Sequence, residues 1–365
     1  MKQNVFIKPE EQSETSFNSA LARKGRIKSN DAISIAKGIG IILMVIGHAG
    51  CPSWMFWFIY LFHMPLFFFL SGYCFKEKYL DDKKTFVIHR LKGLYIPFVK
   101  YNLLFILFHN LLYSMNILEQ PYTWNEALNK SLHIFLMGET EVNLGPYWFL
   151  RYLLLSALAF LLIKWLTRKR PQIIRYGFWL IPFIAIPCNY YQFSHILSSI
   201  MLLSFFFYCA GYMTKKQPIT RNMWIIAGCF IIVAIASIFI NAMMARLNTA
   251  DIIPYCFFAL VGVYASFALS NRIASTKTWL KKTLVYVGNH TMVILTWHFL
   301  VFQFISLFYL KVILNRPFTS VITEEVHQQL GGLHFLVYTV LGITIPLLLQ
   351  WLFSVKHIKR WLHIR

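Results

Sequence analysis

The sequence predicts an all-α, polytopic integral membrane protein with about ten transmembrane helices, and three observations support this class. Of the 365 residues, 58% are hydrophobic and only 13% are charged, whereas an ordinary soluble domain carries about a quarter charged residues. Apolar runs near the ~20 residues that span a bilayer recur along most of the chain. The alternating apolar and polar pattern of a membrane β-barrel does not occur in these runs. The composition also excludes a disordered chain, a collagen-like fibre and a small disulfide scaffold.

Ten apolar segments are predicted to cross the membrane as helices, because backbone polar groups in lipid must bond within their own segment. They cover roughly residues 32–49, 55–75, 97–115, 147–163, 173–187, 196–213, 223–241, 252–269, 286–310 and 335–355. The fifth segment is interrupted by Pro182 and Pro187, so we expect it to be the least regular. The two longest connections, residues 116–146 and 311–334, are expected to contain short helices.

The flanking segments define the expected domain boundaries. Residues 1–31 are polar and predict a cytoplasmic N-terminal tail without a cleavable signal peptide. Residues 32–355 form one transmembrane domain, and residues 356–365 form a cytoplasmic C-terminal tail.

The basic residues orient the helices. The segments that share a side with both termini carry 29 of the 35 Lys and Arg residues, and the opposite connections carry four. The positive-inside rule therefore predicts that both termini are cytoplasmic. Topology explains the net charge of +21, so the charge does not indicate binding of nucleic acid. The cytoplasmic basic residues would also attract anionic lipid or a phosphate-rich cytosolic ligand.

The first predicted helix contains two residues that are costly in a membrane, Lys37 and His48. Their separation of eleven residues puts both on one helix face, ~16 Å apart along the axis. The orientation places Lys37 towards the cytoplasm and His48 towards the outer side. The alternative is a lysine that extends to the lipid headgroups and an interfacial histidine.

The second predicted helix and the connection after it supply further polar candidates. His63 lies mid-span and is followed by Pro65, which frees backbone groups there, and Ser71 lies near the cytoplasmic end. The connection after this helix carries Arg90 and Lys92, whose charges suit phosphate groups. Alternatively, the second helix is kinked only for packing, and the basic residues after it only anchor the chain on the cytoplasmic side.

Two later segments complete the candidate residues. Trp148 and Arg151 open the fourth predicted helix, where a tryptophan is also expected simply at the membrane interface. His298 lies deep in the ninth, where a histidine bonded within the bundle is the alternative. The six cysteines show no metal-binding spacing and no metal site is expected.

Taken in order, these motifs resemble the membrane-bound acyltransferase-3 family. The family has a basic residue, ten intervening positions and a histidine in its first span, as Lys37 and His48 have here. It also has a His-Met-Pro-Leu-Phe-Phe-Phe-x-Ser-Gly-Tyr signature, similar to residues 63–73. A basic segment ending in proline, a Trp-Phe-Leu motif and a late Gly-Asn-x-Thr segment before a histidine match residues 89–97, 148–150 and 288–298. Two positions depart from the family: Ser34 stands where relatives often have an acidic residue, and Gly93 replaces the second arginine of an Arg-x-x-Arg pair.

The resemblance implies a membrane acyltransferase that moves an acetyl or other short acyl group from cytosolic acetyl-CoA to a hydroxyl of a cell-surface or lipid-linked glycan. It points to an integral protein of a bacterial cytoplasmic membrane. His48 would be the general base, or a residue that carries the acyl group covalently, and Lys37 would assist it. Arg90, Lys92 and Ser71 would bind the donor, whereas His63, Trp148, Arg151 and His298 would bind the acceptor.

Two other functions are compatible with ten membrane helices. A proton-coupled transporter of a glycan or small solute would also place His, Lys and Arg in the membrane. However, the chain has no detectable internal repeat and no acidic residue in a predicted span. A lipid-linked glycosyltransferase would need acidic residues in an outer loop, and Glu139 and Glu141 form no recognisable motif.

Overall fold

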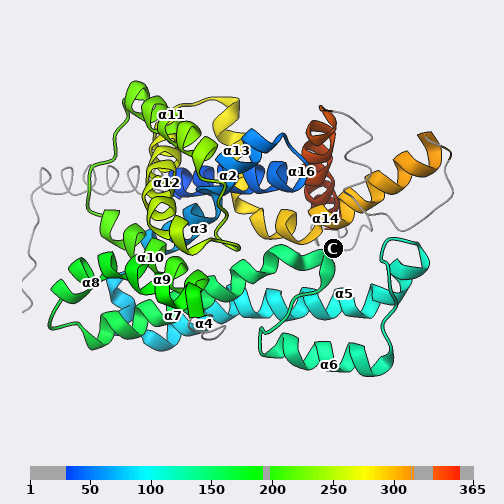
Figure 1. Ribbon diagram of the computed structural model, residues 1–365, viewed down its shortest axis with the longest axis horizontal. Coiled ribbons are helices and arrows are strands. Elements are labelled where there is room, and N and C mark those ends of the chain that lie inside the picture. Colours follow the sequence, from blue (N-terminus) through cyan, green and yellow to red (C-terminus); the bar gives the residue numbers. More distant parts are fainter. Residues whose placement is uncertain (1–29, 192–197, 314, 316–331, 354–365) are drawn as a thin grey trace, which may run out of the picture.

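The computed structural model describes residues 30–191, 198–313, 315 and 332–353 and is shown in Figure 1. Helices make up almost all of this part of the chain, and the pairing of Met243 with Arg246 is an isolated bridge. The all-α membrane class is therefore confirmed. Of the predicted terminal tails, only Asn30 and Asp31 are described, and residues 1–29 and 356–365 lie outside the described residues.

Seven described helices are long and apolar enough to cross a membrane. They are Asn30–His48, Ser53–Tyr73, Lys83–Ser114, Val142–Leu166, Thr249–Ala274, Thr291–Ile313 and His334–Leu352. Two apolar helices are shorter, α10 (Ser199–Thr214) and α11 (Met223–Phe239). The predicted fifth span is irregular: it consists of α8 (Gln172–Gly177), the 3₁₀ turn η4 (Phe178–Leu180) and α9 (Ile181–Tyr191). Ten crossings and the cytoplasmic location of both termini remain predictions.

Two of the predicted spans are broken near the site. The second consists of α2 (Ser53–Tyr60) and α3 (His63–Tyr73), with a break at Leu61 and Phe62. Pro65 explains the break, because its ring would clash with the carbonyl of Leu61 in a continuous helix. The ninth, predicted at residues 286–310, contains the end of α13 (Trp279–Asn289) and then α14 (Thr291–Phe308), and His290 separates the two helices.

The third span begins with a local widening of the helix. Here α4 (Lys83–Arg90) leads through a π-helical turn, η2 (Leu91–Tyr95), into α5 (Ile96–Ser114). Pro97 cannot donate a backbone hydrogen bond, so the preceding turn cannot close in the usual α-helical way. Such π-turns are frequent at functional sites.

Glycines allow the closest helix contacts. A Cβ added at Gly72 of α3 would overlap the backbone of Tyr208 in α10, and one added at Gly211 of α10 would overlap the backbone of Phe69. Small residues let two helix backbones approach closely. In a membrane, where lipid is as apolar as the side chains, this close packing stabilises helix contacts through dispersion instead of the hydrophobic effect. The α3–α10 contact thus forms the centre of the bundle, beside α7 (Trp148–Leu166) and α12 (Ile252–Ala274).

The first helix is held against α13 by polar and glycine contacts. Lys281 forms an ion pair with Asp31 at 2.7 Å, and the Ser34 hydroxyl donates to the side chain of Asn289 at 2.8 Å. A Cβ added at Gly288 would overlap the Ser34 carbonyl. The contact gives a structural reason for the Gly288-Asn289 pair, and it fixes the helix that carries Lys37 and His48.

The connection after α5 forms a helical layer of its own. Figure 1 shows α6 (Trp124–Phe135) lying along α5, and a capping box between Thr123 and Glu126 begins α6. Buried His109 of α5 bonds Glu141 at 2.6 Å, just before the 3₁₀ turn η3 (Val142–Tyr147). This bond ties the connection to α5 directly ahead of α7.

Candidate active site

A cavity of about 540 Å³ lies inside the bundle. Its walls come from the Asn30–His48 helix, α2, α3, the α4–η2 segment, the start of α7, the 243–246 turn and α14. The lining residues with a polar or ionisable side-chain group are Lys37, His48, Tyr60, His63, Ser71, Cys74, Arg90, Trp148, Arg246 and Thr291. Six residues that the sequence singles out, from four segments of the chain, therefore share one cavity.

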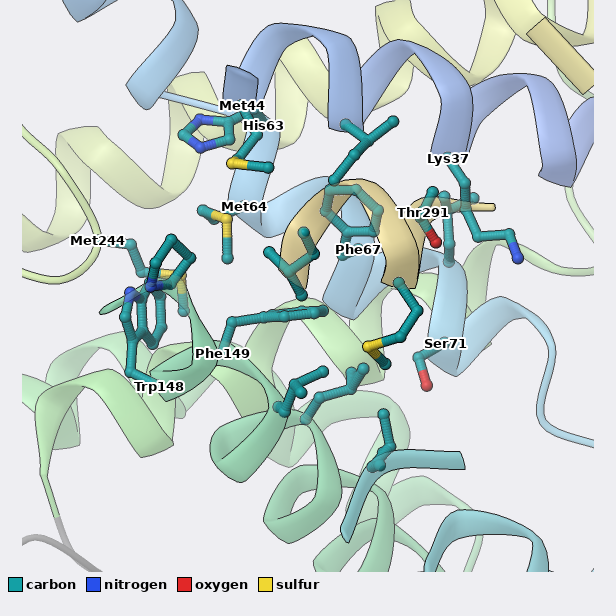
Figure 2. Close-up of a pocket in the computed structure, with 18 of the residues that line it drawn as sticks. Lys37, Met44, His63, Met64, Phe67, Ser71, Trp148, Phe149, Met244 and Thr291 are labelled. Carbon is teal, nitrogen blue, oxygen red and sulfur yellow. The ribbon is translucent and has the colours of Figure 1, made fainter. Parts of the chain in front are cut away.

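The cavity has two chemically different ends. Figure 2 shows Lys37 and Ser71 near one end and His63, Trp148 and Met244 towards the other, with Phe67 and Phe149 between them. Lys37 and His48 lie on the same continuous helix, so they are separated by ~16 Å along its axis. We refer to these as the Lys37 end and the His48 end.

The Lys37 end opens into a second, more polar hollow of about 460 Å³. The two spaces share Ile33, Cys74 and Arg90. The hollow adds Lys76, His89 and Lys215, all in segments that are predicted to be cytoplasmic. A basic entrance thus leads directly to Lys37.

Arg90 is placed at this junction by the local fold. The Asp82 side chain caps the start of α4 by accepting from the Thr85 N–H at 3.1 Å, and Arg90 is the last residue of this helix. Hydrogen bonding from Thr85 holds the pKa of the exposed Asp82 carboxyl below its ordinary value. The Arg90 guanidinium lies over the Phe86 ring at 5.0 Å. None of the ion pairs in the described part of the chain includes Arg90 or Lys37.

The His48 end is built from aromatic rings. The Tyr60 hydroxyl lies 3.4 Å from His48 Nδ1, and the Phe299 ring centroid lies 4.9 Å from that of His48. The His298 ring follows at 5.6 Å, and His63 contacts Tyr60 edge to face at 4.7 Å. The Tyr60 hydroxyl is thus the polar side-chain group within hydrogen-bond reach of the His48 imidazole.

Carbonyl contacts distinguish the three histidines. His63 Nδ1 lies 2.9 Å from the Ile59 carbonyl, and His298 Nδ1 lies 3.0 Å from the Ile294 carbonyl. A carbonyl only accepts, so these two rings carry their proton on Nδ1. His48 faces a hydroxyl instead, which both donates and accepts. The Tyr60 contact therefore permits either tautomer of His48, whereas the carbonyl contacts of His63 and His298 leave Nε2 as the ring nitrogen that can accept a proton.

Three predicted site residues lie outside the cavity lining. Lys92 is exposed on the π-turn, away from the lining that includes Arg90 and Gly93. The Arg151 guanidinium donates to the carbonyls of Met137 and Gly138, at 2.9 and 3.1 Å, so it holds the connection before α7. His298 is fully buried behind His48, and its Nε2 has no hydrogen-bond partner among the described residues.

Sequence reasoning missed Tyr60 and Arg246. Tyr60 lies in the strongly aromatic second span, where no pattern distinguishes it from a packing residue. Arg246 did carry a signal, since it is one of only four basic residues in the predicted outer connections. In the described part of the chain, no cluster of three or more His, Cys, Asp or Glu side chains is arranged to hold a metal ion.

Comparison with known proteins assigns the chain to a class. The family model described as an acyltransferase domain matches residues 30–351, so the chain belongs to the acyltransferase-3 family. It is similar to nodulation protein NolL of Mesorhizobium japonicum (strain LMG 29417 / CECT 9101 / MAFF 303099), with 29% identity over 205 residues. That match covers 52% of this chain and 48% of the relative, so it spans about half the relative's length. None of the solved structures matches this chain significantly.

Family and fold together define the chain as an all-α membrane member of the acyltransferase-3 family. The matched region contains every described helix except the last residue of α16 (His334–Leu352). The match therefore includes the residues at both ends of the cavity and at the basic entrance.

Proposed function

We propose that this protein moves an acetyl or other short acyl group from cytosolic acyl-CoA to a hydroxyl of a cell-surface or lipid-linked glycan, at the cytoplasmic membrane of a bacterium. One observation carries the proposal: a single cavity connects a basic entrance at Arg90 with a histidine at its far end.

The donor fits the Lys37 end by charge and by shape. The nucleotide part of acyl-CoA is anionic and stays in the cytosol, where Arg90, Lys76 and Lys215 surround the entrance. Arg90 and Lys37 have no carboxylate partner among the described residues, so their charges are available to a ligand. The donor's long thiol-bearing arm would extend past Lys37 and Ser71 along the apolar wall to His48.

His48 is the proposed general base. It would take the proton from the acceptor hydroxyl while the hydroxyl oxygen forms a bond to the acyl carbon. The carbon–sulfur bond then breaks, and the CoA thiolate leaves and receives the proton from the imidazolium. Proton transfer of this kind contributes about 10²–10⁴ in rate. Lys37 lies ~16 Å away along the helix axis, so it would contact the donor arm rather than the reacting carbonyl. We propose that the acyl group passes directly from the donor to the acceptor and not through an acyl-histidine intermediate, because direct transfer needs one step fewer.

The test uses purified protein in lipid nanodiscs with radiolabelled acetyl-CoA and cell-envelope glycan. We expect label to move to the glycan with equimolar release of CoA. His48→Gln keeps a polar side chain but cannot accept the proton at neutral pH, so transfer should fall by about 10²–10⁴. His133→Gln is the matched control, because His133 is exposed on α6 and bonds only the Asn129 carbonyl. Transfer by His48→Gln at the wild-type rate would remove His48 from the mechanism.

The same assay separates the transporter alternative. A transporter would move glycan or solute across proteoliposomes without releasing CoA. Mass spectrometry of envelope glycans from a deletion strain would then identify the acyl group and the acceptor together.

A further inference from the structure

Arg246 is a cation that the donor does not explain. It lines the cavity with Met243, Met244 and Ala245 in the turn between α11 and α12. Figure 2 shows Met244 beside Trp148, at the end of the cavity away from Lys37. The basic entrance for the donor lies at that opposite Lys37 end. A donor entering from the predicted cytoplasmic side would place its phosphates at Arg90, far from Arg246.

The turn that carries Arg246 is anchored in the fold. Its backbone N–H donates to the Met243 carbonyl at 3.0 Å, and Met244 is buried. The next residue, Leu247, accepts from the Asn189 side chain at 3.1 Å, and Asn189 accepts from the Ser199 hydroxyl at 2.7 Å. The backbone that presents Arg246 is thus held by α9 and α10.

The Arg246 charge has no partner in the protein that the structure describes. None of the ion pairs in the described residues includes Arg246. Asp251, the next acidic residue along the chain, accepts instead from Asn248. The cavity lining contains Lys37, Arg90 and Arg246 and no Asp or Glu. Arg246 is an exposed cation at the edge of a cavity whose lining has no acidic residue, and such a position favours a negatively charged ligand group.

We propose that the acceptor is an anionic glycan, which carries a carboxylate or a phosphate next to the hydroxyl that receives the acyl group. The proposal rests on the function proposed above and names its substrate class. Arg246 would bind the anion through its planar fork of N–H donors, while Trp148 would pack on the apolar face of the sugar ring. Charge and ring contacts together would direct one hydroxyl towards His48.

The experiment combines labelled acetyl-CoA with total glycan and lipid-linked glycan from the producing cell's envelope. Labelled products are separated on an anion-exchange column. We expect the label in the retained, anionic fraction. Carboxyl reduction before the assay should abolish retention and transfer if the anion is a uronic-type carboxylate, whereas mild acid or phosphatase treatment should do so if it is a phosphate.

Variants test the residue itself. Arg246→Ala should lower transfer about five- to tenfold, with an unchanged KM for acetyl-CoA. Added salt screens the Arg246 charge, so it should lower transfer by the wild-type protein and reduce the difference between the wild type and the variant. Arg246→Lys should keep part of the activity, and Arg246→Glu should lower transfer further. Lys130→Ala is the matched control, because Lys130 lies in another predicted outer connection and pairs with Glu139 at 3.8 Å.

Each contrary result has one meaning. Label in the unretained, neutral fraction, or wild-type transfer by Arg246→Ala, would overturn the anionic acceptor and leave the acyltransferase function intact. Absence of both transfer and CoA release in the wild-type protein would overturn the proposed function, and the acceptor proposal with it.

Discussion

The contact between the first helix and α13 predicts that Gly288→Ala destabilises the protein and disturbs the site. A Cβ at position 288 would overlap the carbonyl of Ser34 and lie 2.9 Å from the Gly38 nitrogen. Real Cβ atoms do not approach backbone atoms this closely, and backbone cannot rotate away as a flexible side chain can. The two helices must therefore separate at the position next to Lys37.

The cost follows from what the separation breaks. Inserting a methyl group into a close-packed contact typically costs about 1–3 kcal/mol, and the upper part of this range applies where backbone is the obstacle. The Ser34–Asn289 hydrogen bond at 2.8 Å lies in the same contact and would lengthen, which adds about 0.5–1.5 kcal/mol. We therefore expect a loss of roughly 2–4 kcal/mol, or about 3–5 °C in apparent Tm for a chain of 365 residues.

The effect is measured by heating purified protein in detergent and using size-exclusion chromatography to determine the fraction that stays folded at each temperature. Gly228→Ala is the matched control, because no atom lies within 4 Å of a Cβ added there and Gly228 is inside α11. That change should keep or raise the Tm, since Ala is about 1 kcal/mol better than Gly in a helix interior. Equal Tm values for Gly288→Ala and the wild type would refute the proposed backbone contact.

Further predictions concern topology, donor and acceptor sides. Cysteine-accessibility labelling in intact cells should reach residues 116–146 from outside and residues 76–96 only after permeabilisation; outside labelling of 76–96 would reverse the orientation. Arg90→Ala should raise the KM for acetyl-CoA about tenfold, with a smaller effect on acceptor KM, and unchanged donor kinetics would make Arg90 a topological anchor. Gly93→Arg, which meets no atom within 4 Å of its Cβ, should lower the donor KM, and a raised KM would contradict a cationic donor site there. Tyr60→Phe should lower kcat more than either KM, because the hydroxyl 3.4 Å from the His48 ring is lost; an unchanged kcat would remove Tyr60 from the positioning of His48.

The all-α membrane class was predictable because burial in lipid leaves helices as the only simple way to bond the backbone. The common face of Lys37 and His48 was predictable for the same reason, since helix geometry fixes side-chain directions within one continuous helix. The local breaks were harder. Pro65 indicated a distortion of the second span, but not where the helix stops. The structure shows that α2 ends at Tyr60, directly before Leu61, whose carbonyl the proline ring would meet in a continuous helix.

Contacts between distant segments were beyond the sequence. Arg151 and Trp148 are neighbours in a helix, and only tertiary structure separates them: Arg151 holds the carbonyls of Met137 and Gly138, while Trp148 lines the cavity. Similarly, counting basic residues made Arg246 a minor exception to a topological rule. Its position on a turn that returns over the His48 end depends on the packing of α9, α10 and α12, which no local pattern encodes.

The arrangement of charge in the cavity connects topology with chemistry. Arg90 and Arg246 lie on segments that are predicted to face opposite sides of the membrane, yet both line one cavity whose wall has no acidic residue. In the proposed reaction, two anionic substrates would therefore enter from opposite sides and meet without crossing each other's binding site. The rigid Asn30–His48 helix sets where they meet, because the ~16 Å between Lys37 and His48 is a fixed helical distance. A donor held at the Lys37 end, as we propose, would then reach the His48 end with its flexible arm, so the acyl group would cross part of the bilayer while the charged nucleotide stays in the cytosol.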